Sequence, residues 1–260
     1  MRRAQDARDR MSDDTQIGGP SGRFPPTRWS AIVAARGDDP AERTRAFETI
    51  VAAYWKPVYK YIRARWGKTN EDAKDLTQEF FARVMEKGFL DSYDPAKSRL
   101  RTFLRTCVDG FVANQDKAAR RIKRGGDAVL MSLDFQTAEG ELARSEPPAP
   151  GTMEEFFEKE WIRNLFSLAL ERLRAECEAR GKAIHFRLFE LYDLEGERKS
   201  RLTYEHLARE FGLAVTDITN HLAFARREFR RITLATLREM TANEEEFRRE
   251  ARTLLGVDPE

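Results

Sequence analysis

The sequence contains little cysteine and no long apolar run. Only Cys107 and Cys177 occur among its 260 residues, so a disulfide scaffold is excluded and the usage fits a reducing cytosol. No stretch approaches the roughly 18 consecutive apolar residues that a membrane-spanning helix requires. The segment Met1–Arg10 carries charges throughout and lacks the apolar centre of a secretory signal. We therefore expect a cytoplasmic protein that does not contact a membrane.

Residues that catalysis needs are also scarce. The three histidines, His185, His206 and His221, have no cysteine or carboxylate at a metal-binding spacing such as H-E-x-x-H. No glycine-rich phosphate loop follows a strand, and no nucleophile elbow is present. Cys107 stands beside Val108 in a helical stretch, which favours a buried structural thiol over a reactive one. The sequence thus predicts a protein that is not an enzyme and has no metal, no cofactor and no small-molecule substrate.

Neither sign of charge is in large excess. Lysine and arginine total 46, aspartate and glutamate total 44, and the net charge is +2. The average charge therefore indicates no particular partner, and any such signal must come from local clusters. The chain does contain 17 phenylalanines, and its apolar positions recur at three- and four-residue spacing almost throughout. The predicted fold class is all-α, and the length favours two helical domains.

Shifts in composition divide the chain into four parts. They are a disordered amino-terminal tail over 1–26, a helical domain over 27–124, a flexible linker over 125–152 and a second helical domain over 153–260. Charges mixed with glycine and proline mark the tail, and the run Pro147–Gly151 marks the linker. The expected architecture is two helical domains joined by that linker.

Two helices are expected at the start of the first domain. An apolar stripe from Phe47 to Ile62 predicts a core-facing helix, which Pro57 either kinks or breaks into two. The next helix runs from Asn70, a suitable N-cap, to about Lys87. Its acidic and apolar side chains gather on opposite faces: Asp72, Asp75, Glu79 and Glu86 against Ala73, Leu76, Phe80 and Val84. Such an acidic face either keeps the surface soluble or docks onto a basic partner helix.

A third helix is expected over Ser98–Ile122, inside a basic stretch. Residues 97–124 contain nine lysines and arginines and only two aspartates. This basic face is either solvated or binds phosphates. Phe103 and Phe111 lie within the stretch, where aromatic rings can stack on unpaired bases. Their spacing alone favours a place in the core.

The segment Thr203–Arg231 has the pattern of a helix-turn-helix in the second domain. Thr203 caps a short helix, Gly212 stands at the turn, and Ile218 and Leu222 form the inward stripe of the next helix. Such a motif lays its second helix in the major groove. The residues expected to contact DNA are Thr203, Thr216, Asp217, Thr219, Asn220, His221, Arg226 and Arg227, the two arginines on phosphates. The alternative is an αα-hairpin with a solvated basic end.

Three segments, in this order, resemble the extracytoplasmic-function (ECF) sigma factors of bacterial RNA polymerase, in the sigma-70 superfamily. Asp72–Phe81 is similar to the acidic helix by which that family binds core polymerase. Leu100–Leu104 and the basic helix that follows resemble the promoter-melting segment, and Leu207–Leu213 with the next helix resembles the C-terminal helix-turn-helix. The resemblance covers roughly residues 28–124 and 154–235.

The resemblance implies an alternative sigma factor whose partners are core RNA polymerase and promoter DNA. The first domain would bind the polymerase clamp and open the minus-ten element, and the second would read the minus-thirty-five element. Polymerase contacts carry over to Asp72, Asp75, Gln78 and Glu79. Minus-ten contacts carry over to Arg101, Phe103, Arg105, Asn114, Lys117 and Arg120.

Departures from the family's pattern bear on control and on promoter choice. Lys74 stands where the family usually carries an acidic residue, and phosphorylation of Thr77 by a Ser/Thr kinase would offset that positive charge. Alternatively, Thr77 is buried and its hydroxyl bonds back to Ala73. Control would otherwise lie with an anti-sigma factor or with the C-terminal helix, expected over about 243–255. The recognition helix lacks an early arginine or lysine, so the promoter sequence stays open.

Two other functions remain compatible with the sequence. One is a helix-turn-helix transcription regulator that binds DNA without direct binding to core polymerase. The other is a helical adaptor whose basic faces bind proteins. Co-purification with core polymerase distinguishes the three, because only a sigma factor binds core and then directs initiation.

Overall fold

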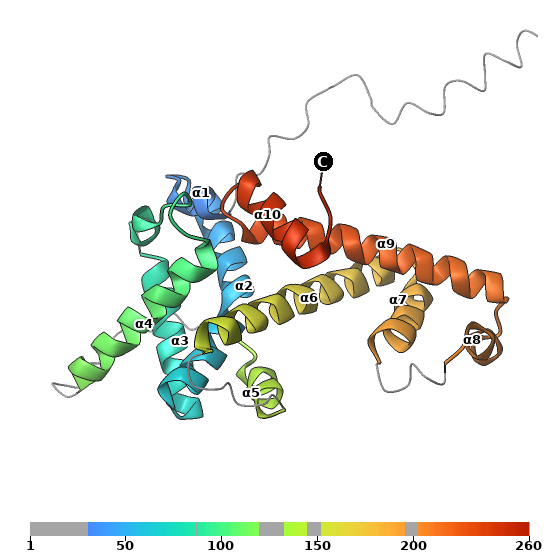
Figure 1. The fold of residues 1–260 in the computed structure, drawn as a ribbon, viewed down its shortest axis with the longest axis horizontal. Helices are drawn as coiled ribbons and strands as arrows, with labels where there is room; N and C mark the ends of the chain where they lie inside the picture. Colours follow the sequence, from blue (N-terminus) through green and yellow to red (C-terminus); the bar gives the residue numbers. More distant parts are fainter. Residues whose placement is uncertain (1–30, 87, 120–132, 145–151, 196–201, 260) are drawn as a thin grey trace, which may run out of the picture.

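Helices account for all the regular structure in the part of the chain that the computed structural model describes, residues 31–86, 88–119, 133–144, 152–195 and 202–259. The all-α prediction is therefore confirmed. The helices form an elongated molecule, in which α6 and α9 lie side by side along part of their length and together connect its two ends (Figure 1). The tail predicted over 1–26 lies outside the described residues.

The first two helices are α1 (Ala31–Arg36) and α2 (Pro40–Trp66). Asp39 caps α2 with its side chain, and the proline that follows suits the first helical position. Gly67 ends the helix in the left-handed conformation, with φ of 58°. The helix runs through the buried Pro57 as one element, so it does not break into two there.

The next elements are α3 (Asn70–Val84), the short 3-10 helix Phe89–Ser92 and α4 (Leu100–Ala119). The N-cap of α3 is Thr69, whose hydroxyl accepts from the Asp72 N–H, and not the predicted Asn70. The Asn70 side chain instead accepts a hydrogen bond from the Tyr59 hydroxyl at 2.8 Å. Threonine and asparagine can both cap a helix, so the sequence alone does not decide between Thr69 and Asn70. The fold decides, because it brings the Tyr59 hydroxyl close to Asn70.

The predicted linker contains a helix, α5 (Phe135–Ala143). Phe135 packs edge-on against Trp55 of α2, with ring centroids 5.4 Å apart. Glu139 pairs with Arg63 at 2.5 Å, also on α2. This part of the interval is therefore bound to the first domain, which corrects the prediction of a flexible linker over all of 125–152. The rest of that interval, at 125–132 and 145–151, lies outside the described residues.

The second half is built on two long helices. The elements are α6 (Met153–Ala179), α7 (Ala183–Phe189) with a π-helical end at Glu190–Leu194, α8 (Tyr204–Phe211), α9 (Val215–Met240) and α10 (Glu244–Leu255). No helix among the described residues is long and apolar enough to cross a membrane.

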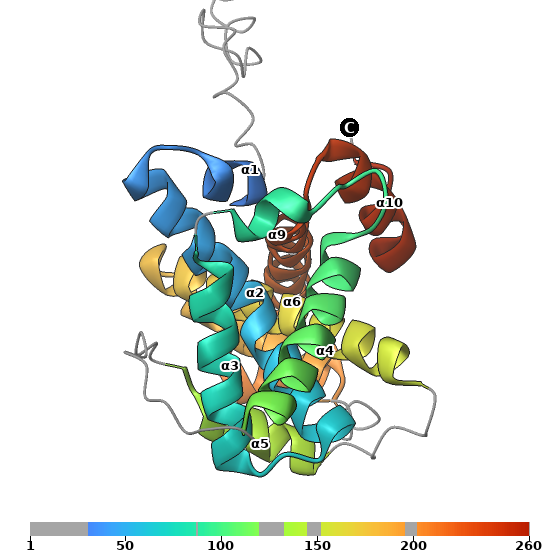
Figure 2. The same ribbon diagram turned by 90° about the vertical axis from the view of Figure 1, so that its left-hand side faces the viewer.

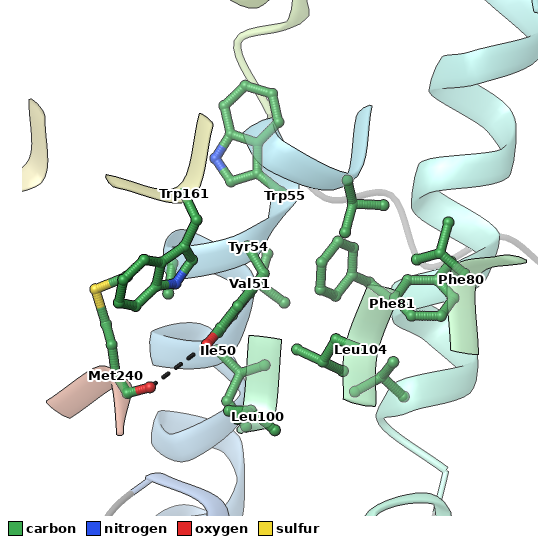
Figure 3. Close-up of a cluster of buried hydrophobic side chains, with 14 of the residues drawn as sticks. Ile50, Val51, Tyr54, Trp55, Phe80, Phe81, Leu100, Leu104, Trp161 and Met240 are labelled. Carbon is green, nitrogen blue, oxygen red and sulfur yellow. Dashed lines mark hydrogen bonds between the residues drawn. The ribbon is translucent and has the colours of Figure 1, made fainter. Parts of the chain in front are cut away.

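Two hydrophobic cores lie at opposite ends of α6 and α9. The first is formed by α1 to α5 and also takes in Trp161 of α6, Met240 of α9 and Phe247 of α10. Trp161 and Met240 lie against Tyr54 of α2, and the Tyr54 hydroxyl donates to the Met240 carbonyl at 3.5 Å (Figure 3). The second core joins the far half of α6 to α7, α8 and the part of α9 up to Ile232.

The predicted boundary at residue 153 therefore does not separate the two cores. At about 1.5 Å of rise per residue, a helix as long as α6 exceeds the width of a small domain. Its 27 residues can thus contribute to both cores, as the 26 residues of α9 do from the other direction.

Candidate functional site

The acidic face expected on α3 is present at the surface. Asp72, Asp75 and Glu79 are exposed and Gln78 is half-buried, while the opposite face of α3 lies in the first core. Asp72 accepts a hydrogen bond from the Thr69 hydroxyl, and Glu79 accepts one from the Gln115 amide of α4. The helix thus presents a row of carboxylates that a basic partner can reach.

Lys74 lies beside this face, whereas Thr77 points into the core. The Lys74 ammonium lies 2.8 Å from Glu71, so a neighbouring carboxylate already pairs with it. Thr77 is 0 % exposed, and its hydroxyl donates to the Ala73 carbonyl at 2.7 Å. The interpretation of Thr77 as a buried residue is confirmed. The folded helix does not present this hydroxyl to a kinase, so the fold gives the predicted phosphosite no support.

Arg101 is the predicted minus-ten residue that the fold buries most deeply. Its side chain is 6 % exposed and pairs with Glu158 of α6 at 2.5 Å and Glu250 of α10 at 2.7 Å. Its guanidinium also lies over the Trp161 ring, 4.7 Å from the centroid. Burial acts to lower the pKa of Arg101, but hydrogen bonding and charge from Glu250 and Glu158 raise it overall. In this conformation Glu158 and Glu250 enclose the Arg101 guanidinium, so a DNA contact at Arg101 stays a prediction that requires these ion pairs to open.

The other predicted residues of α4 are divided between core and surface. Phe103 is half-buried against Tyr93, with centroids 5.2 Å apart, whereas Phe111 is buried against Phe80. Arg105 pairs with Glu154 at 3.1 Å. Asn114 is exposed. Lys117 belongs to α4, although its side chain is not described, and Arg120 lies outside the described residues.

Asp109 has a structural role that sequence reasoning missed. Its carboxylate accepts a hydrogen bond from the Tyr61 hydroxyl at 3.1 Å and one from the Trp66 indole at 3.3 Å. Burial and the Asp109 charge raise the pKa of Tyr61. An acidic residue at this position of a basic helix thus ties α4 to α2. The signal in the sequence is the aspartate itself, because an acidic side chain within a basic helix is expected to pair with a hydrogen-bond donor or a cation nearby.

The helix, glycine turn and second helix expected over Thr203–Arg231 are present as α8, Gly212 and α9. The Thr203 hydroxyl caps α8 by accepting from the His206 N–H, and Gly212 turns the chain with φ of 65°. Ile218 and Leu222 are buried between the helices. The start of α9 carries the predicted base-contacting residues, of which Thr216, Thr219 and Asn220 are exposed. Asp217 is half-buried and accepts from the Ala214 N–H at 3.4 Å, which caps the helix.

His221 is less free than its neighbours. Its ring stacks on that of His185 of α7, with centroids 4.0 Å apart and planes 7° from parallel. Burial and the nearby His221 lower the pKa of His185, which keeps that ring neutral. One face of the His221 ring therefore packs against α7. Only the other face and the ring edge can contact DNA.

The two predicted phosphate contacts also differ. Arg226 is fixed by Asp193 of the π-helical turn, through two hydrogen bonds of 2.9 and 3.1 Å. These bonds raise the pKa of Arg226. Arg227 is 69 % exposed, and its guanidinium lies 5.7 Å from the centroid of the Phe224 ring. Arg227 can reach a phosphate without breaking a bidentate ion pair.

In the described ranges, no group of three or more His, Cys, Asp or Glu side chains is placed so that it could hold a metal ion. The thiols of Cys107 and Cys177 are free, and burial raises the pKa of Cys107 to about 11. A thiol with that pKa stays protonated near neutral pH, which agrees with a structural role.

Comparison with known proteins identifies one segment of the chain. Residues 50–122 match the family model for sigma-70 region 2. No curated protein and no solved structure matches the chain at a significant level. The matched segment takes in most of α2, the acidic face of α3 and all of α4, and it stops well before α8 and α9. The first helices thus contain a segment similar to sigma-70 region 2, which supports a role in promoter recognition by RNA polymerase.

Proposed function

We propose that this protein is an alternative sigma factor of the ECF type, which binds core RNA polymerase and directs initiation at particular promoters without catalysis of its own. The observation that carries the proposal is the match of residues 50–122 to sigma-70 region 2, together with an exposed row of carboxylates on α3 within it. Complementary charges at such an interface speed association and select the partner.

Each part of the molecule has a role in this proposal. The carboxylates of α3 contact a basic surface of the polymerase clamp. Phe103 and Asn114 of α4, with Lys117 further along the helix, contact the minus-ten element. Asn220 of α9 reads bases of the minus-thirty-five element, because an asparagine amide can bond both adenine groups in the major groove. Arg227 of α9 holds a phosphate.

Control by phosphorylation of Thr77 is not part of the proposal, because the hydroxyl is buried and bonded to Ala73. Control by an anti-sigma factor or by the C-terminal helix remains compatible with the fold. Both act on contacts between elements and require no modified residue.

Run-off transcription with purified core polymerase tests the proposal. The informative variant replaces Asp72, Asp75 and Glu79 with alanine. A matched control replaces Glu48, Glu171 and Glu178, three exposed carboxylates outside this face. We expect the α3 variant to bind core about tenfold more weakly or worse, since close interfacial charge pairs contribute a few kcal/mol. The control should bind like the unaltered chain.

The same experiment separates the rival functions. A regulator that acts without polymerase would bind promoter DNA but not core, and the α3 variant would leave its DNA binding unchanged. A protein-binding adaptor would bind neither. Equal binding of core by the α3 variant and the unaltered chain would contradict the assignment of this face.

A further inference from the structure

The C-terminal helix α10 lies at the end of the molecule where the chain enters α4 (Figure 2). Glu246 of α10 accepts a hydrogen bond from the Leu100 N–H, the first amide of α4, at 3.3 Å. The first amides of a helix have no partner within the helix and attract anions. A carboxylate of α10 therefore occupies a position that is electrostatically suited to a phosphate.

A second carboxylate of α10 binds the arginines beside that position. Glu250 is 1 % exposed and lies 2.7 Å from the Arg101 guanidinium and 3.1 Å from that of Arg99. Glu158 of α6 approaches the same two arginines from the other side, at 2.5 Å from Arg101 and 3.7 Å from Arg99. The basic start of α4 is thus neutralised by side chains from two other helices.

An apolar contact holds α10 in this position. Phe247 is buried in the first core, and the Arg238 guanidinium lies over its ring at 4.2 Å from the centroid. Glu246 also accepts from the Ala242 N–H at 2.7 Å, which fixes the turn between α9 and α10. Docking of α10 therefore rests on two separable contributions, one of charge and one of apolar packing.

Such an arrangement suits exchange of one anion for another. Replacing a buried ion pair with apolar residues is often neutral or stabilising, so charges are a weak way to hold two helices together. Carboxylate and phosphate make the same charge-assisted, bidentate contacts with arginine. Arg99 and Arg101 cannot bind Glu250 and a nucleic-acid phosphate in the same geometry at once.

We propose that α10 is a built-in competitor of DNA, which places Glu246 and Glu250 on the start of α4 where backbone phosphates of single-stranded promoter DNA bind after its release. The proposal rests on the proposed function, because it takes α4 to be a DNA-binding element. It also reconciles the buried position of Arg101 with the role that the family resemblance implies for it. In the docked form the protein binds DNA weakly, and release of α10 uncovers both arginines and the first amide of α4.

Binding of a fluorescein-labelled single-stranded DNA of mixed sequence to the full chain tests the proposal. Glu250→Gln removes the competing charge without changing the shape of the side chain. Glu245→Gln, at an exposed position on the same helix, removes an equal charge and serves as the control. We expect Glu250→Gln to bind the DNA about tenfold more tightly than the unaltered chain, the effect of one charge-assisted contact. Glu245→Gln should bind like the unaltered chain.

A second variant guards against misfolding, because removal of one partner of a buried pair can destabilise a protein. Phe247→Ala weakens the docking of α10 and leaves every charge in place, so it should also raise DNA affinity.

Arg99→Ala adds a further test. It should reduce DNA affinity strongly in the Glu250→Gln background and little in the unaltered chain, where Glu250 already holds Arg99. An equal loss in both backgrounds would overturn the competition.

The outcomes keep this proposal distinct from the proposed function. If the unaltered chain directs initiation with core, but Glu250→Gln and Phe247→Ala bind DNA no better than it does, α10 is not a competitor. If the unaltered chain and both variants bind neither core nor DNA, the proposed function fails and the competitor role fails with it. Tighter DNA binding by both variants, with an unchanged control, establishes the competitor.

Discussion

At the scale of single residues, hydrogen bonds that carboxylates accept from side chains far away in the sequence decide which charges of α4 are free. Asp109 accepts from the Tyr61 hydroxyl and the Trp66 indole, both from the end of α2. Arg101 is enclosed by Glu158 and Glu250. These two side chains of α4 therefore bind other helices of the same chain, although both lie in the segment that matches region 2.

Replacement of Asp109 tests its structural role. Asp109→Ala leaves two partly buried donors without an acceptor, so we expect it to lower the free energy of unfolding by about 1–2 kcal/mol. Asp109→Asn retains an acceptor oxygen and should cost less. Urea denaturation measures both, with the exposed Glu86→Ala as a control that should change little. An Asp109→Ala chain as stable as the original would show that water replaces both bonds.

Two arginines of α9, Arg226 and Arg227, give a prediction about DNA. Arg227→Ala should weaken binding to all duplex sequences alike and lower the salt dependence by about one phosphate contact, because its guanidinium is exposed. Arg226→Ala should affect DNA less, since Asp193 already binds that side chain. Titration of labelled duplex at several salt concentrations measures both slopes. A larger loss for Arg226→Ala than for Arg227→Ala would reverse the assignment.

At the scale of elements, a histidine pair joins α7 to α9, the helix proposed to read DNA. His185 stacks on His221 and lies edge-on to Phe224, and Lys182 adds a positive charge nearby. The pKa of His185 is lowered below its ordinary 6.5. Burial is the larger cause, and the neighbouring His221 and Lys182 add to it. The folded state therefore favours the neutral ring.

The pH dependence of stability follows from that shift. Between the lowered pKa and 6.5 the unfolded chain binds more protons than the folded one, so the contribution of His185 is complete above pH 6.5 and is lost below it. Thermal melting on either side of this pH should show a larger loss for the unaltered chain than for His185→Asn. Equal losses would mean that the stacked pair tolerates a proton.

The packing of α5 against α2 should also weaken at acid pH. The hydrogen bond from Arg63 holds the pKa of Glu139 below its ordinary 4.5. The stabilisation is therefore present above pH 4.5 and is lost as the pH falls through the lowered pKa. The protection of the α5 amides against hydrogen exchange, relative to the intrinsic rate at each pH, should fall in that range, and in Glu139→Gln it should be lower already at neutral pH. Unchanged protection of α5 at acid pH would show that Phe135 alone holds the helix.

The elements that the sequence predicted well are those fixed by neighbouring residues. The cap at Thr203, the turn at Gly212 and the span of α10 depend only on residues a few positions away. The helix α5 was missed because its nine residues give a short apolar pattern next to a proline-rich run. The burial of Arg101 could not be predicted, because its partner Glu250 is far along the chain and only the fold brings them together.

At the scale of the whole molecule, α6 and α9 make the two cores interdependent. Trp161 of α6 and Met240 of α9 belong to the first core, while Leu173 of α6 and Leu222 of α9 belong to the second. Neither end can therefore unfold without changing the helices that support the other. The region that matches sigma-70 region 2 is coupled in this way to the helices proposed to read the minus-thirty-five element.

Cooperative unfolding is the measurable consequence. Leu222→Ala removes a fully buried side chain from the second core and should cost about 2–5 kcal/mol. Because α6 and α9 are continuous, the loss should also lower the melting temperature reported by tryptophan fluorescence, which senses Trp55 and Trp161 in the first core. The exposed Ala223→Ser, one position along α9, should leave that temperature nearly unchanged. If the fluorescence transition of Leu222→Ala stays in place while the helical signal by circular dichroism splits into two steps, the cores are independent and the long helices transmit no stability between them.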